Sequence, residues 1–546
     1  MKKTLMVLLT AALALGAVNS VFAGGQQSSG SSGSGENMAN KNPVGALPIV
    51  KQKENFTFLI DNNGTVEKKL VYPFFEKDTN VHVNWMLFPY ATALERKNIL
   101  MSTGDYPDAI GGWILSETDV MTMSREGTII PLENLIDQYA PNIKKALDIP
   151  GVRANMTLPD GHIYSPPYVI EEPLVSFSPW INQKWLDQLG LKMPATTAEF
   201  KQVLIAFRDR IPNVNGQKII PFSGDPNNLG LGTLAGWFGV NASNGGVNAG
   251  YLALINGQVE SSAIRPEYKE FIKYFADLYK EGLIDPELFT QDNATWKAKG
   301  KLGLYGVSFA YGSGDFAPEL RTPDLTPWLL NYTFQPLPVL KGPNVSKPLY
   351  RRNGFGVTTF RTQMVITDKA KNPVTIIRWL DYTYDELHSL ENARGPAGVL
   401  FEKIGDHQYR EISRKVGQNG WTQADADKYA WGEPYVYEMP KYLRPKTEVT
   451  ILPPEGEQPV YDELGPRDKL YEPYLEAQPM PQVWLAGADA TRAADLQTAI
   501  TEYVKQKQAQ WISGQANVDA EWDAYLAQLN RLGLQELLTI KRNAIK

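Results

Sequence analysis

The most distinctive chemical groups in this chain of 546 residues are aromatic side chains beside the expected ends of strands. Trp113 ends an apolar stretch, Trp237 and Tyr311 lie in glycine-rich sequence near strand exits, and Trp431 lies in a long segment without clear periodicity. A flat aromatic ring can stack on the apolar face of a sugar ring, but it also packs well inside a core. Each of these four residues could therefore either stack on a sugar or pack in the core.

Planar polar side chains occur at similar positions. They are Asp61 and Asn63 after the first expected strand, Glu172 at an expected crossover, Asp225 and Asn227 after a later strand, and Arg352 in an arginine pair. Carboxylates and amides can hydrogen-bond pairs of hydroxyl groups, and each can also cap a turn. Arg352 would favour an acidic ligand if it reached the same site, and a solvated arginine pair is the alternative. With the aromatic residues, this chemistry suits a carbohydrate-binding site.

Sequence patterns that would indicate catalysis are missing. The four histidines are far apart, and neither a His-Glu-x-x-His nor a Gly-x-Ser-x-Gly pattern occurs. The sequence contains no cysteine, which excludes thiolate nucleophiles, thiolate metal sites and disulfides. The 60 acidic residues make chance carboxylate pairs inevitable, so a glycosidase-like pair cannot be recognised. We expect a non-catalytic binding protein; a secreted polysaccharide-active enzyme is the alternative, and an adhesin is a third class.

The elements that would position these residues alternate between strands and helices. The expected strands span 56–60, 81–88 and 108–113, and the expected helices span 66–77 and 91–102. This alternation predicts an α/β fold with a parallel sheet. Ligands of such sheets bind beyond the carboxyl ends of the strands, which is where Asp61 and Trp113 would lie.

A second set of elements begins after a long crossover stretch, 158–207. This stretch combines a turn, extended runs and a helix whose start is marked by a capping box of Thr196 and Glu199. Further strands are expected at 219–222 and 301–309, whereas 334–340 and 355–359 are expected to return to the first lobe. We therefore predict a signal peptide at 1–23, a flexible Gly/Ser linker at 24–50, a first lobe at 51–172 plus 335–395, and a second lobe at 173–334 plus 396–546.

The N-terminus and the charge indicate where the protein works. Lys2 and Lys3 precede an apolar run and the sequence Val21-Phe22-Ala23, which is typical of a secretory signal cleaved after Ala23. We therefore expect a location outside the cytoplasm. The chain has 54 basic and 60 acidic residues, a net charge of −6, which argues against nucleic acid as a partner.

Several phrases of the sequence, in their order and spacing, resemble a known family. They are Pro107-Asp108, Ile130-Pro131-Leu132, LPDGHIY at 158–164, WINQKWL at 180–186, LYKEGLIDP at 278–286, RWLDY at 378–382, and the end from 503 to 534. The chain resembles the extracellular solute-binding proteins of ABC importers, in the large oligosaccharide-binding branch typified by the lipoprotein and alginate-oligosaccharide binders. The resemblance spans nearly all of the mature chain.

The resemblance implies a two-lobed type 2 periplasmic-binding-protein fold with extra C-terminal helices, which closes around an oligosaccharide in a hinge cleft. It also implies membrane permease subunits as partners, and we expect a monomer without a cofactor. Family members often carry a lipidated cysteine after the signal. Ala23-Gly24 stands there in this chain, so we expect a free periplasmic or extracytoplasmic protein that is not lipidated.

Relatives of this branch often contain a calcium loop that resembles half an EF-hand. The matching stretch here runs from Ile211 to Ile220, with Ile211 at the first ligand position and no acidic residue after it. A hard cation such as Ca²⁺ requires several oxygen ligands, some of them carboxylates. We therefore expect the loop to be degenerate and the protein to bind no metal there.

Overall fold

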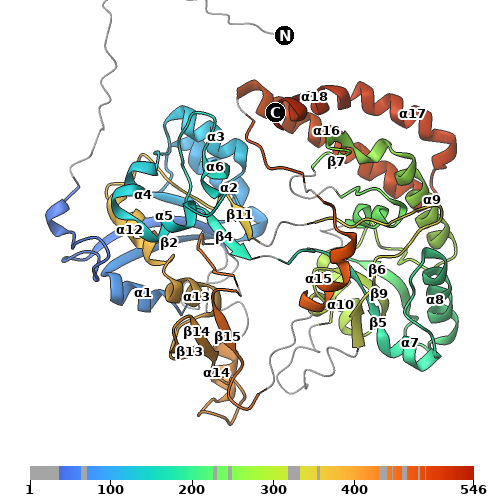
Figure 1. Cartoon of the computed structure of the whole chain (residues 1–546), viewed down its shortest axis with the longest axis horizontal. Helices are drawn as coiled ribbons and strands as arrows, with labels where there is room; N and C mark the ends of the chain where they lie inside the picture. Colours follow the sequence, from blue (N-terminus) through green and yellow to red (C-terminus); the bar gives the residue numbers. More distant parts are fainter. Residues whose placement is uncertain are drawn as a thin grey trace, which may run out of the picture. The chain divides into compact units, whose positions relative to one another are not determined.

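In the computed structural model, two sets of strands and helices form separate sheets and cores, which we call the first and the second lobe (Figure 1). The structure describes residues 36–62, 70–171, 173–214, 216–225, 230–243, 249–317, 333–352, 357–429, 439–445, 447–457, 464–477, 480–485 and 487–545. The predicted signal peptide therefore lies outside the described residues.

The first lobe is built on a four-stranded sheet in the order β12-β3-β1-β2. The strand β1 (Glu54–Asp61) is parallel to β2 (Val81–Phe88) and to β3 (Ala109–Gly111), whereas β12 (Met364–Ile366) is antiparallel to β3. The end of β1 is buried on both faces, as expected for a parallel strand covered by helices. The predicted parallel sheet is confirmed, and its three parallel strands end at one edge.

The remaining elements of the first lobe surround this sheet. They are η1 (Met38–Asn40), α1 (Tyr72–Thr79), α2 (Tyr90–Thr103), α3 (Glu117–Glu126), α4 (Glu133–Tyr139), α5 (Pro141–Leu147), α6 (Val152–Met156), β4 (Tyr168–Glu171), β11 (Val357–Phe360), α12 (Pro373–Tyr382) and α13 (Glu386–Arg394). The strands β4 and β11 form an antiparallel pair. Trp379 of α12 packs against Phe56 and Phe75 in the core.

The second lobe contains a mixed sheet in the order β10-β5-β9-β6. The strand β9 (Tyr305–Ala310) is parallel to β6 (Ile220–Gly224) and antiparallel to β5 (Ser178–Asn182), which in turn is antiparallel to β10 (Phe334–Pro336). Every residue of β5 and β9 is buried. The carboxyl ends of β6 and β9 and the start of β5 therefore lie at the same edge, because Ser178 pairs with Ala310 and Gly224 with Phe309.

Helices and short hairpins complete the second lobe. They are α7 (Gln183–Leu189), α8 (Thr197–Arg210), η3 (Gly230–Phe238), β7 (Leu252–Ile255), β8 (Gln258–Ser261), η5 (Ser262–Ile264), α9 (Pro266–Lys280), α10 (Asn293–Lys301), η6 (Ser313–Asp315), α15 (Leu464–Tyr471), η8 (Glu472–Tyr474), α16 (Gly487–Ile512), α17 (Val518–Arg531) and α18 (Leu534–Ile545). The helix α8 begins with the predicted capping box of Thr196 and Glu199. Apolar residues of α9, α16, α17 and α18 share one core cluster.

Two of the predicted domain boundaries are wrong. The strand β10 hydrogen-bonds to β5, so residues 335 and 336, which were assigned to the first lobe, belong with residue 334 to the second. The segment with β13 (Phe401–Gly405), β14 (Gln408–Glu411), α14 (Gln423–Lys428) and β15 (Thr450–Leu452) packs its apolar residues against Leu387 and Leu390 of α13. This segment is thus attached to the first lobe, although 396–546 was assigned to the second.

The predicted flexible linker is also too long. Ile49 and Val50 are buried in the first core, and Lys41 forms an ion pair with Glu54 at 2.7 Å. Arg378 of α12 donates hydrogen bonds to the carbonyl groups of Asn42 and Pro43. Residues 37–50 are therefore part of the first lobe, because these contacts outweigh their turn-rich composition.

None of the helices within the described ranges combines the length and the apolar character needed to cross a membrane.

Candidate functional site

Trp113 lies at the edge of the first sheet where the parallel strands end, and 43% of its surface is exposed. Its backbone N–H donates a 2.9 Å hydrogen bond to Oδ1 of Asp61, the last residue of the neighbouring strand β1. Asp61 itself is only 2% exposed. Asp61 was predicted to contact the ligand directly; in the structure its carboxylate supports the loop that carries Trp113.

Gly112 makes this contact possible. Its φ of +88° lies in the left-handed region, and a Cβ at this position would meet Asp61 Oδ1 at 1.8 Å. Its N–H donates to the carbonyl of Gln363 at 2.9 Å. A glycine is thus required for the close approach of the carboxylate to the backbone before Trp113.

A buried lysine supports the other side of the same loop. Lys97 of α2 is 1% exposed, and its Nζ donates to the carbonyl of Ile114 at 3.0 Å and pairs with Asp119 at 2.8 Å. Burial opposes ionisation of Asp119, but hydrogen bonds from Lys97 and Ser116 outweigh it and lower the pKa of Asp119. The residues on both sides of Trp113 are therefore fixed before any ligand arrives.

Two further aromatic side chains complete this group, which we call the first-lobe aromatic cluster: Trp113, Tyr168 and Phe360. The rings of Trp113 and Phe360 meet edge to face at 5.2 Å, and that of Tyr168 lies 5.4 Å from Phe360 and 6.4 Å from Trp113. Lys441 Nζ lies 5.2 Å from the centroid of the Tyr168 ring. The cluster presents the half-exposed indole on a rigid aromatic base, a geometry that suits stacking on a sugar.

The second lobe has a smaller aromatic group at its own strand edge. Tyr311 follows β9 and Phe177 precedes β5, and their rings meet edge to face at 5.8 Å. Both residues are half-buried. Tyr311 thus keeps the position at a strand exit that the sequence predicted, and Phe177 joins it through the pairing of β5 with β9. We call these two residues the second-lobe aromatic pair.

Asp225 comes directly after β6 at the same edge and is 8% exposed. Its N–H donates to the carbonyl of Phe309 at 3.0 Å, and its Oδ1 accepts a 3.3 Å hydrogen bond from Asn293 at the start of α10. Asp225 was predicted to contact the ligand directly and is nearly buried in the structure. Asp225 ties the end of β6 to α10.

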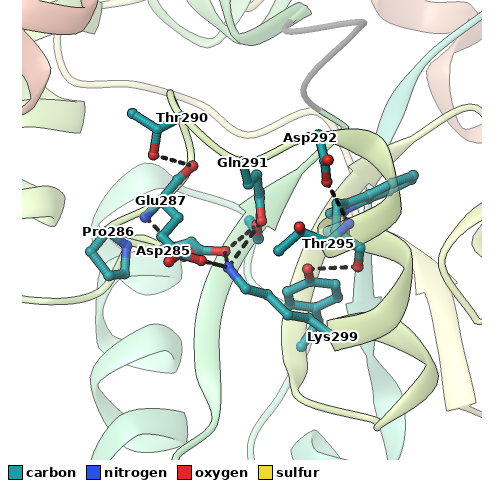
Figure 2. Close-up of polar contacts among 12 residues, drawn as sticks. Asp285, Pro286, Glu287, Thr290, Gln291, Asp292, Thr295 and Lys299 are labelled. Carbon is teal, nitrogen blue, oxygen red and sulfur yellow. Dashed lines mark hydrogen bonds and ion pairs between the residues drawn. The ribbon is translucent and has the colours of Figure 1, made fainter.

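A buried polar network holds α10 beneath this edge. Figure 2 shows Lys299 reaching from α10 toward Asp285 and Gln291. Lys299 Nζ lies 2.9 Å from Oδ2 of Asp285, a residue with 1% exposure, and 3.0 Å from Oε1 of Gln291. Ser223 of β6 donates to the same carboxylate at 3.0 Å. Because a buried carboxylate needs such partners, this network fixes α10 against β6.

Two other candidate residues, Trp237 and Arg352, have contacts within the protein. Trp237 was predicted to stack on a ligand; in the structure its side chain is fully buried between Phe200 and Phe275. Arg352 donates through Nε to the carbonyl of Glu476 at 3.0 Å, so its guanidinium is engaged within the protein.

The remaining candidates, Asn63, Glu172, Asn227 and Trp431, lie outside the described residues. Sequence reasoning missed Phe177 and Phe360 as members of aromatic groups. Phe177 comes directly before the strand 178–182 within the crossover, which was a usable signal. Phe360 joins the cluster only through the long-range pairing of β11 with β4, which no local pattern reveals.

The loop that matches the calcium site of relatives is closed by backbone contacts. Ile211 is 7% exposed and belongs to the apolar core of the second lobe. Val214 and Gln217 exchange two backbone hydrogen bonds of 2.9 Å. Over the described part of the chain, no group of three or more histidine, aspartate or glutamate side chains could hold a metal ion.

The fold and the aromatic groups at the strand edges define a two-lobed α/β binding protein. No family model matches the sequence. The chain is 34% identical over 502 residues to the fructooligosaccharide ABC transporter substrate-binding protein FusA of Streptococcus pneumoniae serotype 4, covering 87% of this chain and 86% of that protein.

Solved structures agree with this relationship. The complex of S. pneumoniae FusA with kestose is 31% identical, covers 90% of this chain and 98% of that chain, and has a TM-score of 0.74. The alginate-binding protein AlgQ2 without calcium is 24% identical with a TM-score of 0.70, covers 91% of this chain and 98% of that chain, and shares the fold. The chain belongs to the oligosaccharide-binding branch of the ABC transporter substrate-binding proteins, as the resemblance of its sequence indicated.

Proposed function

We propose that this protein is the non-catalytic solute-binding component of an ABC importer and that it captures a fructooligosaccharide between its two lobes. The observation that carries this proposal is Trp113, a 43% exposed indole on a fixed loop at the carboxyl edge of the first sheet. An exposed aromatic ring that is rigidly supported suits repeated binding and release of a sugar, because little ordering is needed when the ligand arrives.

The distribution of aromatic side chains supports a ligand that both lobes contact. The first-lobe aromatic cluster and the second-lobe aromatic pair each lie at the edge where parallel strands of their own sheet end. A sugar chain offers apolar ring faces to more than one aromatic group, whereas its hydroxyl groups require polar partners beside them. Closure of the lobes around the ligand would bring both groups to it.

The choice of a fructooligosaccharide over an acidic sugar rests on the similarity to FusA. FusA, which is 34% identical to this chain, is a fructooligosaccharide-binding protein by name.

The partners and the location follow the same proposal. A solute-binding protein of this family hands its ligand to the permease subunits of the transporter in the membrane, and we propose that it does so as a monomer. The segment 1–23 would direct it out of the cytoplasm. LipO of Bacillus subtilis, which is 27% identical over 238 residues covering 42% of this chain and 44% of that protein, is a lipoprotein by name. The present sequence has no cysteine, which supports an unlipidated protein.

A thermal-shift screen tests the proposal. Purified protein is melted with kestose, nystose, maltotriose and an alginate oligosaccharide, and each sugar is then recovered and examined by chromatography. We expect a rise in Tm with kestose and nystose and no cleavage of either sugar. A product of hydrolysis would support the polysaccharide-active enzyme instead, and a shift only with the alginate oligosaccharide would overturn the neutral ligand.

A further inference from the structure

Arg467 is a buried arginine of α15 whose side chain donates hydrogen bonds to several backbone carbonyl groups. It is 0% exposed. Its Nη1 donates to the carbonyl of Tyr311 at 2.7 Å and to that of Ser176 at 3.3 Å, and its Nη2 donates to the carbonyl of Val175. A guanidinium carries several N–H donors in a fixed plane, so one side chain can hold several carbonyl groups at once.

Asp468, the next residue of α15, binds the same stretch of backbone. Its Oδ2 accepts a 2.6 Å hydrogen bond from the N–H of Leu174, and its Oδ1 accepts from Arg467 Nε at 3.3 Å. Leu174, Val175 and Ser176 belong to the segment that joins β4 of the first lobe to β5 of the second. Two consecutive side chains thus hold three consecutive residues of the first connection between the lobes.

The second connection, which leads from β10 to β11, is held next to the first. Tyr471 of α15 donates its hydroxyl proton to the carbonyl of Leu337. Tyr350 donates to the carbonyl of Phe177 at 2.6 Å, and the rings of Tyr350 and Tyr471 meet edge to face at 4.5 Å. The helix α15 therefore contacts both connections at their second-lobe ends.

The guanidinium of Arg467 also lies against the second-lobe aromatic pair. Its carbon atom Cζ is 5.7 Å from the centroid of the Tyr311 ring, and the ring of Phe177 meets that of Tyr311 at 5.8 Å. Ser176, one of its carbonyl partners, immediately precedes Phe177. One side chain is thus bonded to the backbone of Tyr311 and to the residue before Phe177.

We propose that Arg467 is a positioning residue for ligand binding, which fixes Tyr311 and Phe177 relative to the first connection so that the pair is presented to the sugar in one arrangement. This inference rests on the proposed function, because it gives the aromatic pair a sugar to bind. Arg467 itself does not touch the ligand, since it is fully buried beneath these residues.

The chain offers a matched control for this proposal in the first lobe. Arg378 of α12 is 5% exposed, and its guanidinium likewise donates to three carbonyl groups, those of Asn42, Ile49 and Pro43. These residues lie in the N-terminal segment and include no member of either aromatic group. Loss of either arginine removes the same kind of bonds, but only Arg467 holds the aromatic pair.

The experiment compares Arg467→Met, Arg467→Lys and Arg378→Met with the wild-type protein by calorimetric titration with kestose and by thermal melting. We expect both methionine variants to melt at lower temperature. We expect the Kd for kestose to rise about tenfold or more in Arg467→Met and to stay within about twofold in Arg378→Met. Arg467→Lys keeps the charge but not the planar fork, so it should recover part of the affinity.

Amide hydrogen exchange without ligand gives a second readout. We expect faster exchange at Leu174 and Gly312 in both Arg467 variants, with β1 unchanged, and no change at these amides in Arg378→Met. An affinity loss as large in Arg378→Met as in Arg467→Met would overturn the proposal, because it would reflect lower stability alone. Unchanged exchange in the Arg467 variants at Gly312, whose peptide carbonyl is the Tyr311 acceptor of Arg467, would overturn it as well.

These outcomes separate the inference from the function on which it rests. If the wild-type protein binds none of the tested sugars, the proposed function fails while the exchange data still decide whether Arg467 holds this backbone. If Arg467→Met does not fold, the kestose titration and the hydrogen-exchange measurement are made on Arg467→Lys. If the wild-type protein and Arg467→Lys then bind kestose equally and exchange equally at Gly312, the positioning role of the arginine is wrong.

Discussion

The carboxylate of Asp61 accepts the backbone N–H of Trp113 at 2.9 Å, so the last residue of one parallel strand orients the aromatic residue that follows the next. The carboxylate lies so close to the backbone of Gly112 that a side chain at this position would not fit. It turns the edge of the first sheet into a rigid support for an exposed indole. This support is the feature on which the proposed binding site depends.

Replacement of Trp113 by alanine should weaken sugar binding. The indole is 43% exposed, so its removal leaves no cavity in the core and should cost little stability. We expect a loss of about 2 kcal/mol in binding free energy, about thirtyfold in Kd, with a partial recovery in Trp113→Phe. Calorimetric titration with kestose measures the loss; equal affinity of Trp113→Ala and wild type would remove this residue from the site.

Replacement of Asp61 tests the support behind Trp113. In Asp61→Ala the N–H of Trp113 loses its acceptor, and we expect a loss of stability of about 1 to 3 kcal/mol together with weaker binding. Asp61→Asn keeps a carbonyl oxygen at the same place and should retain most of both. Thermal melting and titration of the two variants measure this difference, and indistinguishable behaviour of alanine and asparagine would contradict the orienting role.

How far the sequence could predict this site is clear from its two candidate tryptophans. Trp113 and Trp237 both lie beside glycines near strand exits, and only Trp113 is exposed. The glycines before Trp237 serve close packing: a Cβ on Gly232 would meet the carbonyl oxygen of Ala242 at 2.1 Å, and one on Gly236 that of Leu349 at the same distance. The glycines before Trp237 therefore allow a close approach of two backbone segments and do not indicate an open loop. Amino-acid composition alone does not distinguish these two uses of glycine.

The bounds of individual strands and helices were predicted better than the way these elements pair and pack with one another. The strand β2 has the predicted bounds Val81–Phe88, and the capping box of α8 is present, because both depend on local periodicity and capping chemistry. The pairing of β10 with β5 and the attachment of the segment with β13 and β14 to α13 depend on contacts between distant residues. The burial of Asp61 and Asp225 also depends on contacts between distant residues, because the order of the strands decides which groups lie beside each carboxylate.

A pH-dependent contribution to stability is expected from Asp381 of α12. Burial raises the pKa of Asp381 to about 6, although its carboxylate accepts the N–H groups of Asn142 and Ile143. The unfolded value is about 3.9. Because the folded pKa is higher, the native state binds a proton more tightly, and this stabilisation is full below about pH 4 and lost as the pH rises through about 6.

The variant Asp381→Asn isolates this effect. We expect the Tm of the wild type relative to Asp381→Asn to fall as the pH rises from about 4 to about 7, by an amount that corresponds to about 2 to 3 kcal/mol. Melting curves of both proteins at intervals across this range give the difference. A constant difference in Tm would show that the carboxyl group has the same pKa in the folded and unfolded states.

Calcium should have no effect on this protein. In the loop that we expect to correspond to the calcium site of relatives, Ile211 is buried in the core, and Val214 and Gln217 exchange backbone hydrogen bonds. Melting in excess Ca²⁺ and in excess chelator should therefore give the same Tm. A lower Tm in chelator, restored by Ca²⁺ but not by Mg²⁺, would show that the loop or another site still binds the ion.

The central claim is that the protein binds a fructooligosaccharide reversibly without altering it. Its most direct test is a calorimetric titration of the wild-type protein with kestose. The sugar is then recovered from the calorimeter cell and examined by chromatography. The account predicts saturable binding with one sugar per chain and kestose returned intact. Absence of binding heat together with an unchanged Tm, or release of fructose from the recovered sugar, would contradict it.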